Sequence, residues 1–149
     1  MAAPRKIDMI VVHHTITPGT QTVDKTISSI NRTHKERLHP KAGKLGHIAY
    51  HYLIFPNGRV VTTRPEGEIG YHASNEVVNG RSIGIALVGN YDVDKPSGPL
   101  LWALRDKIKD IKSRIYIKDV VGHRKYAAKT CPGKKITDQM ILEAFKPKA

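Results

Sequence analysis

The sequence is poor in cysteine, in aromatic residues and in acidic residues. Of its 149 residues, one is cysteine (Cys131), 6% are aromatic, and 13 are acidic against 25 basic, which gives a formal net charge of +12. A single cysteine cannot form an intramolecular disulfide, so a disulfide-stapled scaffold is excluded. Cys131 is therefore an inert core residue, a nucleophile or a metal ligand.

Long hydrophobic runs are also missing. No apolar stretch is long enough to cross a bilayer, and the basic N-terminus lacks the apolar segment and cleavage site of a signal peptide. We therefore expect no transmembrane segment and a protein that is made and folded in the cytoplasm. Hydrophobic residues make up 40% of the chain, which is enough for the core of one domain and excludes a disordered chain.

The positive charge favours polyanionic partners through long-range attraction. Nucleic acid and an anionic cell envelope are the two candidates, and solubility alone is the simpler explanation. No zinc-finger pairing, RNA-binding motif or phosphate loop supports nucleic acid, and the low aromatic content disfavours a base-stacking surface. We therefore expect no specific nucleic-acid partner and favour anionic polymers of the cell envelope.

Hydrophobic patterning predicts alternating strands and helices. The expected strands are 9–13, 48–55, 59–64, 83–88 and 119–123; the expected helices run from Val23 to before Pro40, over 99–111, and after an N-cap at Thr137 or Asp138. Residues 65–82 are expected to form a long loop, 1–8 a mobile basic arm and 146–149 a basic tail. This order predicts a single α/β domain over 1–149, with a mixed central β-sheet flanked by helices.

Two of the predicted strands end in histidine. The first reads VVHH and ends at His13 and His14, the last reads VVGH and ends at His123, and Cys131 follows eight residues later. Strand ends on one edge of an α/β sheet are where such proteins place their sites. Two imidazoles and a thiolate bind zinc and leave a fourth position for water, as in catalytic zinc sites. The alternative is that these are ordinary surface or hydrogen-bonded side chains, because the spacing is not a specific signature.

Neighbouring side chains of a strand point to opposite faces, so only one of His13 and His14 is expected to face a site. The spacing does not decide which of the two it is.

Five blocks of sequence then resemble one known family. They occur in the family's order and read VVHHT, GHIAYHYLI, GYHA, RSIGIALVGNY and VGHRKYAAKTCPG. In these blocks residues 9–145 resemble the zinc-dependent N-acetylmuramoyl-L-alanine amidases, which include the peptidoglycan recognition proteins. In length and single-domain layout the chain is most similar to the short lysozyme-type amidases of T-odd bacteriophages.

The resemblance implies roles for particular residues. It implies one zinc ion with water in the fourth position, and three protein ligands: His13, His123 and Cys131. It implies catalytic roles for Tyr50 and Lys129 and a place in the substrate cleft for His72, whereas His14 is not a ligand. The remaining histidines match no motif and are expected at the surface or in packing: His34, His39, His47 and His51.

The resemblance also implies an activity: hydrolysis of the amide between the lactyl group of N-acetylmuramic acid and L-alanine in peptidoglycan. Some family members carry an acidic residue in the strand that here holds Ala86 and Val88, so the general base is Tyr50, the zinc-bound hydroxide or another residue. We expect a monomeric endolysin that stays in the host cytoplasm until release and then acts on the cell wall. The alternative is a non-catalytic peptidoglycan-binding module, although such members typically lack the cysteine ligand.

Overall fold

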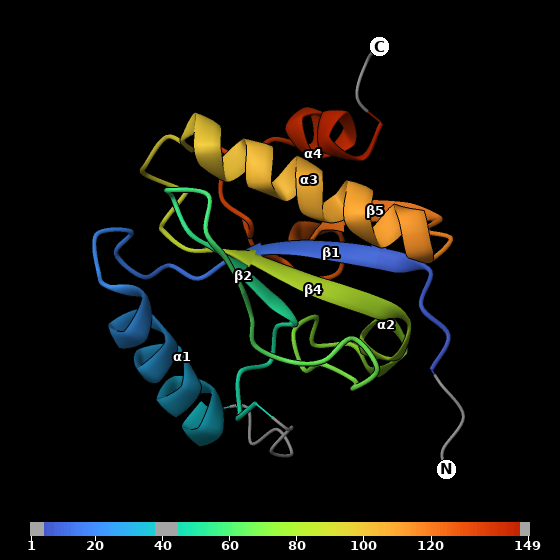
Figure 1. Cartoon of the computed structure of the whole chain (residues 1–149), viewed down its shortest axis with the longest axis horizontal. Coiled ribbons are helices and arrows are strands. Elements are labelled where there is room, and N and C mark those ends of the chain that lie inside the picture. Colours follow the sequence, from blue (N-terminus) through green and yellow to red (C-terminus); the bar gives the residue numbers. More distant parts are fainter. Residues whose placement is uncertain (1–4, 38–44, 147–149) are drawn as a thin grey trace.

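The computed structural model describes residues 5–37 and 45–146, and a five-stranded mixed sheet forms its centre (Figure 1). The strand order is β3-β2-β4-β1-β5, and only the β2–β3 pair is antiparallel. The strands are β1 (Met9–His14), β2 (Tyr52–Ile54), β3 (Val60–Thr62), β4 (Ser82–Leu87) and β5 (Asp119–Gly122). All six residues of β1 are buried, as expected of a central strand covered on both faces.

Helices cover both faces of the sheet (Figure 1). One face holds α3 (Gly98–Arg114) and α4 (Asp138–Phe145), and the other holds α1 (Val23–Arg37) and α2 (Glu76–Arg81). Alternate residues of β1 divide between them: Ile10 and Val12 pack in the cluster that includes α3 and α4, whereas Met9 and Val11 pack with Ala73 and with Val78 of α2. His13 therefore falls on the face of α1 and α2.

Several local signals in the sequence produce the structures that they predict. Thr22 accepts a hydrogen bond from the Lys25 N–H at the start of α1, and Thr137 accepts one from the Met140 N–H at the start of α4. Gly58, at φ 91°, makes the turn between β2 and β3. The predicted α/β fold with a mixed sheet is confirmed.

Two of the predicted elements are wrong in extent. The loop expected over 65–82 contains α2, because the Asn75 side chain caps it by accepting a hydrogen bond from the Val78 N–H. The strand expected over 48–55 is shorter in the structure, where it consists only of β2. The backbone of residues 49–51 instead pairs with the following loop, where the Tyr71 N–H donates to the Ala49 carbonyl and the Thr63 N–H donates to the His51 carbonyl.

The described end of the N-terminal arm is anchored, contrary to the expectation of a mobile start. The half-buried Arg5 guanidinium donates to the backbone carbonyls of Glu66 and Ser82, each at 2.9 Å, and Asp8 forms an ion pair with Arg81 at 2.7 Å. Three parts of the chain that figured in the predictions lie outside the described residues. They are residues 1–4 of the arm, residues 147–149 of the tail, and the segment before Pro40 that includes His39. In the described parts of the chain, no helix has the length and apolar character needed to cross a membrane.

Candidate metal and active site

The carboxyl ends of β1 and β5 bring two histidines together. The strands are parallel neighbours with Val12 beside Gly122. His13 and His123, which follow these two residues in the sequence, therefore lie at the same edge of the sheet. His123 begins η1 (His123–Lys125), a short 3-10 helix. The centroids of the two imidazole rings are 4.6 Å apart.

The loop that carries Cys131 folds back onto this edge. The Arg124 N–H donates to the Cys131 carbonyl at 2.8 Å, which ties the loop to η1. Gly122 makes room for the return, because a Cβ at this position would lie only 2.8 Å from Cδ of Pro132. The His14 N–H donates to Sγ of Cys131 at 3.4 Å and holds the sulfur beside the end of β1.

His13, His123 and Cys131 form a compact donor set. Their ligand atoms all lie within 4.8 Å of one another, and Nδ1 of His13 is 3.8 Å from Sγ of Cys131. His123 hydrogen-bonds to the backbone of Ala73, whereas its buried Nε2 has no hydrogen-bond partner. Buried polar atoms are rarely left without a partner. A metal ion bound to this nitrogen would satisfy it, so the three residues fit a zinc site with one open position.

Burial keeps these donors uncharged when no cation is bound. It lowers the pKa of His13 well below the usual value, with neighbouring histidines adding to the effect, and it also lowers the pKa of His123. Burial raises the pKa of the Cys131 thiol to about 11, although the His14 N–H and the Lys129 ammonium act in the opposite direction. A divalent cation would therefore find neutral imidazoles and would supply the charge that stabilises a thiolate.

A cavity of about 300 Å³ opens over this donor set and is lined by Tyr50, Lys129 and His72 among others. The Tyr50 ring centroid is 5.1 Å from that of His13. Burial, and to a lesser degree Cys131, raises the pKa of the Tyr50 phenol well above its usual value, so Tyr50 is a hydrogen-bond donor at neutral pH. Lys129 is exposed at the rim. The residues singled out in the sequence thus converge on one cavity.

His72 and His14 occupy different surroundings. His72 is 5% exposed, and its Nδ1 is 2.9 Å from Nε2 of His13, so its ring lies directly against a member of the donor set. The His14 ring packs on the opposite face, where its Nδ1 accepts a hydrogen bond from the Tyr91 N–H at 3.1 Å. The alternation expected for adjacent strand residues therefore holds.

His34 is a cavity residue that the sequence analysis assigned to the surface or to packing. Its Nδ1 accepts a hydrogen bond from the Ala49 N–H at 2.8 Å, and its ring centroid is 5.1 Å from that of Tyr50. The signal was present in the sequence, since His34 continues the inward helical stripe of Val23, Ile27 and Ile30. A polar residue in such a stripe faces either the core or a site.

No carboxylate lines the cavity in the described part of the chain. Ala86 pairs with His13 in the β1–β4 register, and it is fully buried in an apolar cluster with Ile30 and Leu53. An acidic side chain at this position would have to replace apolar packing. The absence of an acidic residue from β4, noted in the sequence, therefore extends to the described walls of the cavity.

Two lining residues adopt a strained backbone conformation. Ile16 (φ 60°) and Ser74 (φ 54°) are the non-glycine residues with positive φ in the described chain, and both line this cavity. Ile16 is held by its N–H, which donates to the Gly89 carbonyl at 2.9 Å, while its side chain is 62% exposed. Such strain is uncommon for a β-branched residue and concentrates at functional sites.

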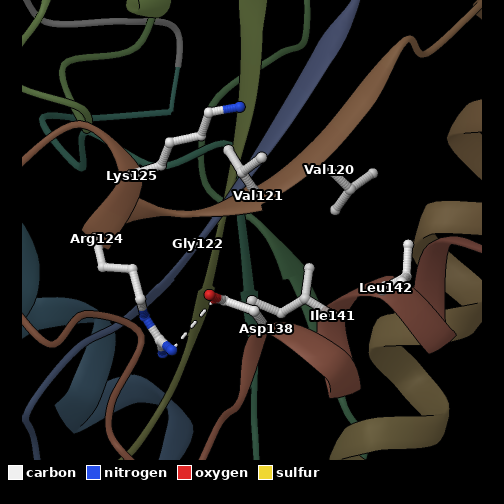
Figure 2. A pocket seen from close by; sticks show the side chains of 8 residues that line it. All are labelled: Val120, Val121, Gly122, Arg124, Lys125, Asp138, Ile141 and Leu142. Atoms are coloured by element: carbon white, nitrogen blue, oxygen red, sulfur yellow. Dashed lines mark ion pairs between the residues drawn. The ribbon is translucent and has the colours of Figure 1, made fainter.

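A second hollow, of about 470 Å³, lies outside β5 against α4 (Figure 2). Figure 2 shows Arg124 directed at Asp138, and their ion pair measures 3.3 Å. Its other lining residues are mostly apolar, and neither a histidine nor a cysteine is among those described. The candidate metal ligands therefore lie together at the smaller cavity, over His13, His123 and Cys131.

The chain is also similar to known proteins. The profile of the family described as N-acetylmuramoyl-L-alanine amidase matches residues 3–134. A peptidoglycan recognition protein from Bombyx mori is 30% identical over 142 residues, which cover 91% of this chain and 69% of that protein. An N-acetylmuramoyl-L-alanine amidase from Sus scrofa is 28% identical over 131 residues, which cover 85% of this chain but only 22% of that much longer protein.

Solved structures share the whole fold. An N-acetylmuramoyl-L-alanine amidase from Clostridium intestinale superposes with a TM-score of 0.81 at 27% identity, covering 97% of this chain and 89% of that one. An endolysin N-acetylmuramoyl-L-alanine amidase from the same organism gives a TM-score of 0.73 at 29% identity, covering 90% of this chain and 82% of that one.

Proposed function

The chain belongs to the N-acetylmuramoyl-L-alanine amidase family, and we propose that it is a zinc-dependent peptidoglycan hydrolase. In this proposal it cleaves the amide between the lactyl group of N-acetylmuramic acid and L-alanine. The observation that carries the proposal is the donor set of His13, His123 and Cys131 at the floor of an open cavity, with Nε2 of His123 unpartnered. Two imidazoles and one thiolate leave the open position that a catalytic zinc site needs.

An amide is a poor electrophile, so its hydrolysis needs both an activated water and a stabilised oxyanion. When bound, zinc lowers the pKa of a ligand water to about 7 and polarises a carbonyl. The protonated Tyr50 phenol donates a hydrogen bond to the carbonyl oxygen as negative charge develops there, and the Lys129 ammonium attracts the same charge. No carboxylate is among the described residues that line the cavity, so these walls offer no acidic general base.

The first test is hydrolysis of purified peptidoglycan, measured as newly freed L-alanine amines. Native protein, chelator-treated protein, zinc-restored protein and Cys131→Ser are compared at equal concentration. Amines released only with zinc and Cys131 support the amidase. Protein that is folded and zinc-loaded, and that binds peptidoglycan without releasing amines, would instead be a binding module.

A matched pair of lysine variants separates catalysis from general attraction. Lys129→Met and Lys134→Met remove the same charge from two exposed lysines of one loop, but only Lys129 lines the cavity. The proposal expects kcat to fall about 10²–10³-fold in Lys129→Met, the typical effect of losing one oxyanion-stabilising group. Lys134→Met should keep the native kcat; equal losses in both variants would reduce Lys129 to one of many surface charges.

We further propose an endolysin role, in which the chain remains in the host cytoplasm until the membrane is breached. One of the similar solved structures is described as an endolysin, and the formal charge of +12 suits attraction to anionic envelope polymers. Cells that express the chain should stay intact until their membrane is permeabilised and then lyse. Lysis without permeabilisation would contradict this role, and added salt should weaken envelope binding.

A further inference from the structure

The face of the sheet below the cavity holds a row of residues that leads to His13. Ser82, Gly84 and Ala86 pair with Met9, Val11 and His13 in the parallel β1–β4 register. Because side chains alternate along a strand, these residues share the face of α1 and α2. Ser82 begins β4 and His13 lies near the end of β1, so the two are too far apart to touch directly.

The His72 ring bridges this gap. Its Nδ1 lies 2.9 Å from Nε2 of His13, and its Nε2 lies 3.2 Å from Oγ of Ser82. All three residues are buried, with exposed fractions of 1% for His13, 5% for His72 and 0% for Ser82. Both nitrogens of His72 are therefore occupied by protein partners.

Two glycines provide the space for this ring. A Cβ at Gly84 would lie 2.6 Å from Cγ of His72, and a Cβ at Gly70 would lie 2.8 Å from its Cδ2. Glycine inside a strand costs stability, so a glycine in the middle of β4 needs a packing reason. That reason is the His72 ring, which occupies the space that a side chain at Gly84 would need.

The order of donors and acceptors follows from the metal-binding atom. Nδ1 of His13 faces Cys131, so Nδ1 is the nitrogen that would bind the metal. A neutral imidazole that binds a metal through Nδ1 carries its proton on Nε2. Nε2–H of His13 then donates to Nδ1 of His72. This places the His72 proton on its Nε2, which donates to Oγ of Ser82. The two hydrogen bonds therefore run in one direction, from His13 through His72 to Ser82.

We propose that His72 and Ser82 are positioning residues that fix the tautomer and the ring orientation of His13 for metal binding. This inference rests on the proposed function only in requiring that His13, His123 and Cys131 hold zinc. It gives His72 a role behind the donor set in place of the substrate contact implied by resemblance. Partners of this kind typically change metal affinity 10–100-fold when they are removed.

Three variants test the proposal. His72→Phe keeps a ring of similar volume and removes both nitrogens, whereas Ser82→Ala removes only the hydroxyl. Thr26→Val is the matched control, because Thr26 of α1 is fully buried, its hydroxyl donates to the Thr22 carbonyl, and it is not among the residues that line the cavity. Zinc dissociation constants are measured by competition with a chromogenic chelator, and circular dichroism checks that each variant is folded.

The proposal expects about 10–100-fold weaker zinc binding in His72→Phe, a smaller loss in Ser82→Ala and no change in Thr26→Val. Ring ¹⁵N chemical shifts of the zinc-loaded protein should show His13 and His72 both protonated at Nε2. Ser82→Ala that binds zinc as tightly as Thr26→Val, or a His72 protonated at Nδ1, overturns the proposal.

These measurements are independent of peptidoglycan cleavage. If the native protein binds zinc but leaves peptidoglycan intact, the proposed function fails. The zinc affinities and the ring ¹⁵N shifts of the variants then still decide whether His72 and Ser82 position His13. If the native protein does not bind zinc, both proposals fail together.

Discussion

Gly84→Ala would place one methyl group against the His72 ring. The added Cβ would lie 2.6, 2.7 and 2.8 Å from Cγ, Cδ2 and Nδ1 of His72. Carbon atoms in ordinary contact are about 3.5–4.0 Å apart, so the ring has to move by about 1 Å. A displacement of that size disrupts the 2.9 Å contact between His72 and His13.

The expected loss of stability can be worked from two opposing effects. Overpacking a buried site costs about 1–3 kcal/mol, whereas replacing a strand glycine by alanine otherwise gains about 0.5–1 kcal/mol. We therefore expect Gly84→Ala to lower the free energy of unfolding by roughly 0–2.5 kcal/mol. Urea unfolding in chelator measures this packing effect without any contribution from zinc, and a separate titration measures zinc affinity.

Gly80→Ala is the matched control for the same chemical change. Gly80 lies in α2, and a Cβ there would have no neighbour within 4 Å. This variant should be more stable by about 0.5–1 kcal/mol and should bind zinc like the native protein. The reasoning is refuted if Gly84→Ala matches Gly80→Ala in stability and also keeps native zinc affinity, because the ring would then be free to move without consequence.

Three further predictions concern other parts of the molecule. Tyr50→Phe should lower kcat without removing either limb of the pH–rate profile, because burial keeps the phenol protonated. Tyr71→Phe, which changes another tyrosine of the cavity lining, is the control. Loss of a limb in Tyr50→Phe would show that Tyr50 ionises. Ile16→Gly removes about 1–2 kcal/mol of strain from a left-handed backbone conformation and takes away a largely exposed side chain. The urea midpoint should therefore be unchanged or raised, while KM rises. A midpoint well below that of the native protein would contradict this. Burial alone would raise the pKa of Glu66, but hydrogen bonds from Arg114 and Tyr52 bring it below its usual value. The stabilisation that Glu66 provides is therefore complete above the unfolded-state pKa and is lost as pH falls through the folded-state pKa. Glu66→Gln should therefore flatten the acid limb of stability against pH, and an unchanged slope would exclude this contribution.

The sequence predicted two histidine positions of the donor set because they follow strands, whereas Cys131 lies in a loop and the full ligand set came from the family resemblance. His13 and His123 each come at the end of an apolar run, and parallel strands bring such ends to one edge of the sheet. Spacing alone did not decide between His13 and His14. The structure decides it, because His14 contacts the Tyr91 N–H on the opposite face.

The contacts behind the donor set could not be predicted in the same way. His72 is in an irregular loop, where no period indicates the direction of a side chain, and its partner Ser82 is the first residue of a strand. The helix α2 between them has only six residues, too few for a helical stripe to emerge, so its cap at Asn75 was the only signal. Arg5, which anchors the N-terminal arm to this region, reads in the sequence as one of many surface cations.

The glycines of the site connect these two kinds of information. In a sequence, Gly84 and Gly122 indicate weak points or ends of strands. In the structure, Gly84 lies under the His72 ring and Gly122 lies under Pro132, beside Cys131. These two strand glycines therefore mark places where a residue from a distant loop packs onto the sheet. His13 at the end of β1 locates one part of the site, and Gly84, on the same sheet face, locates the loop residue His72 that packs beside it.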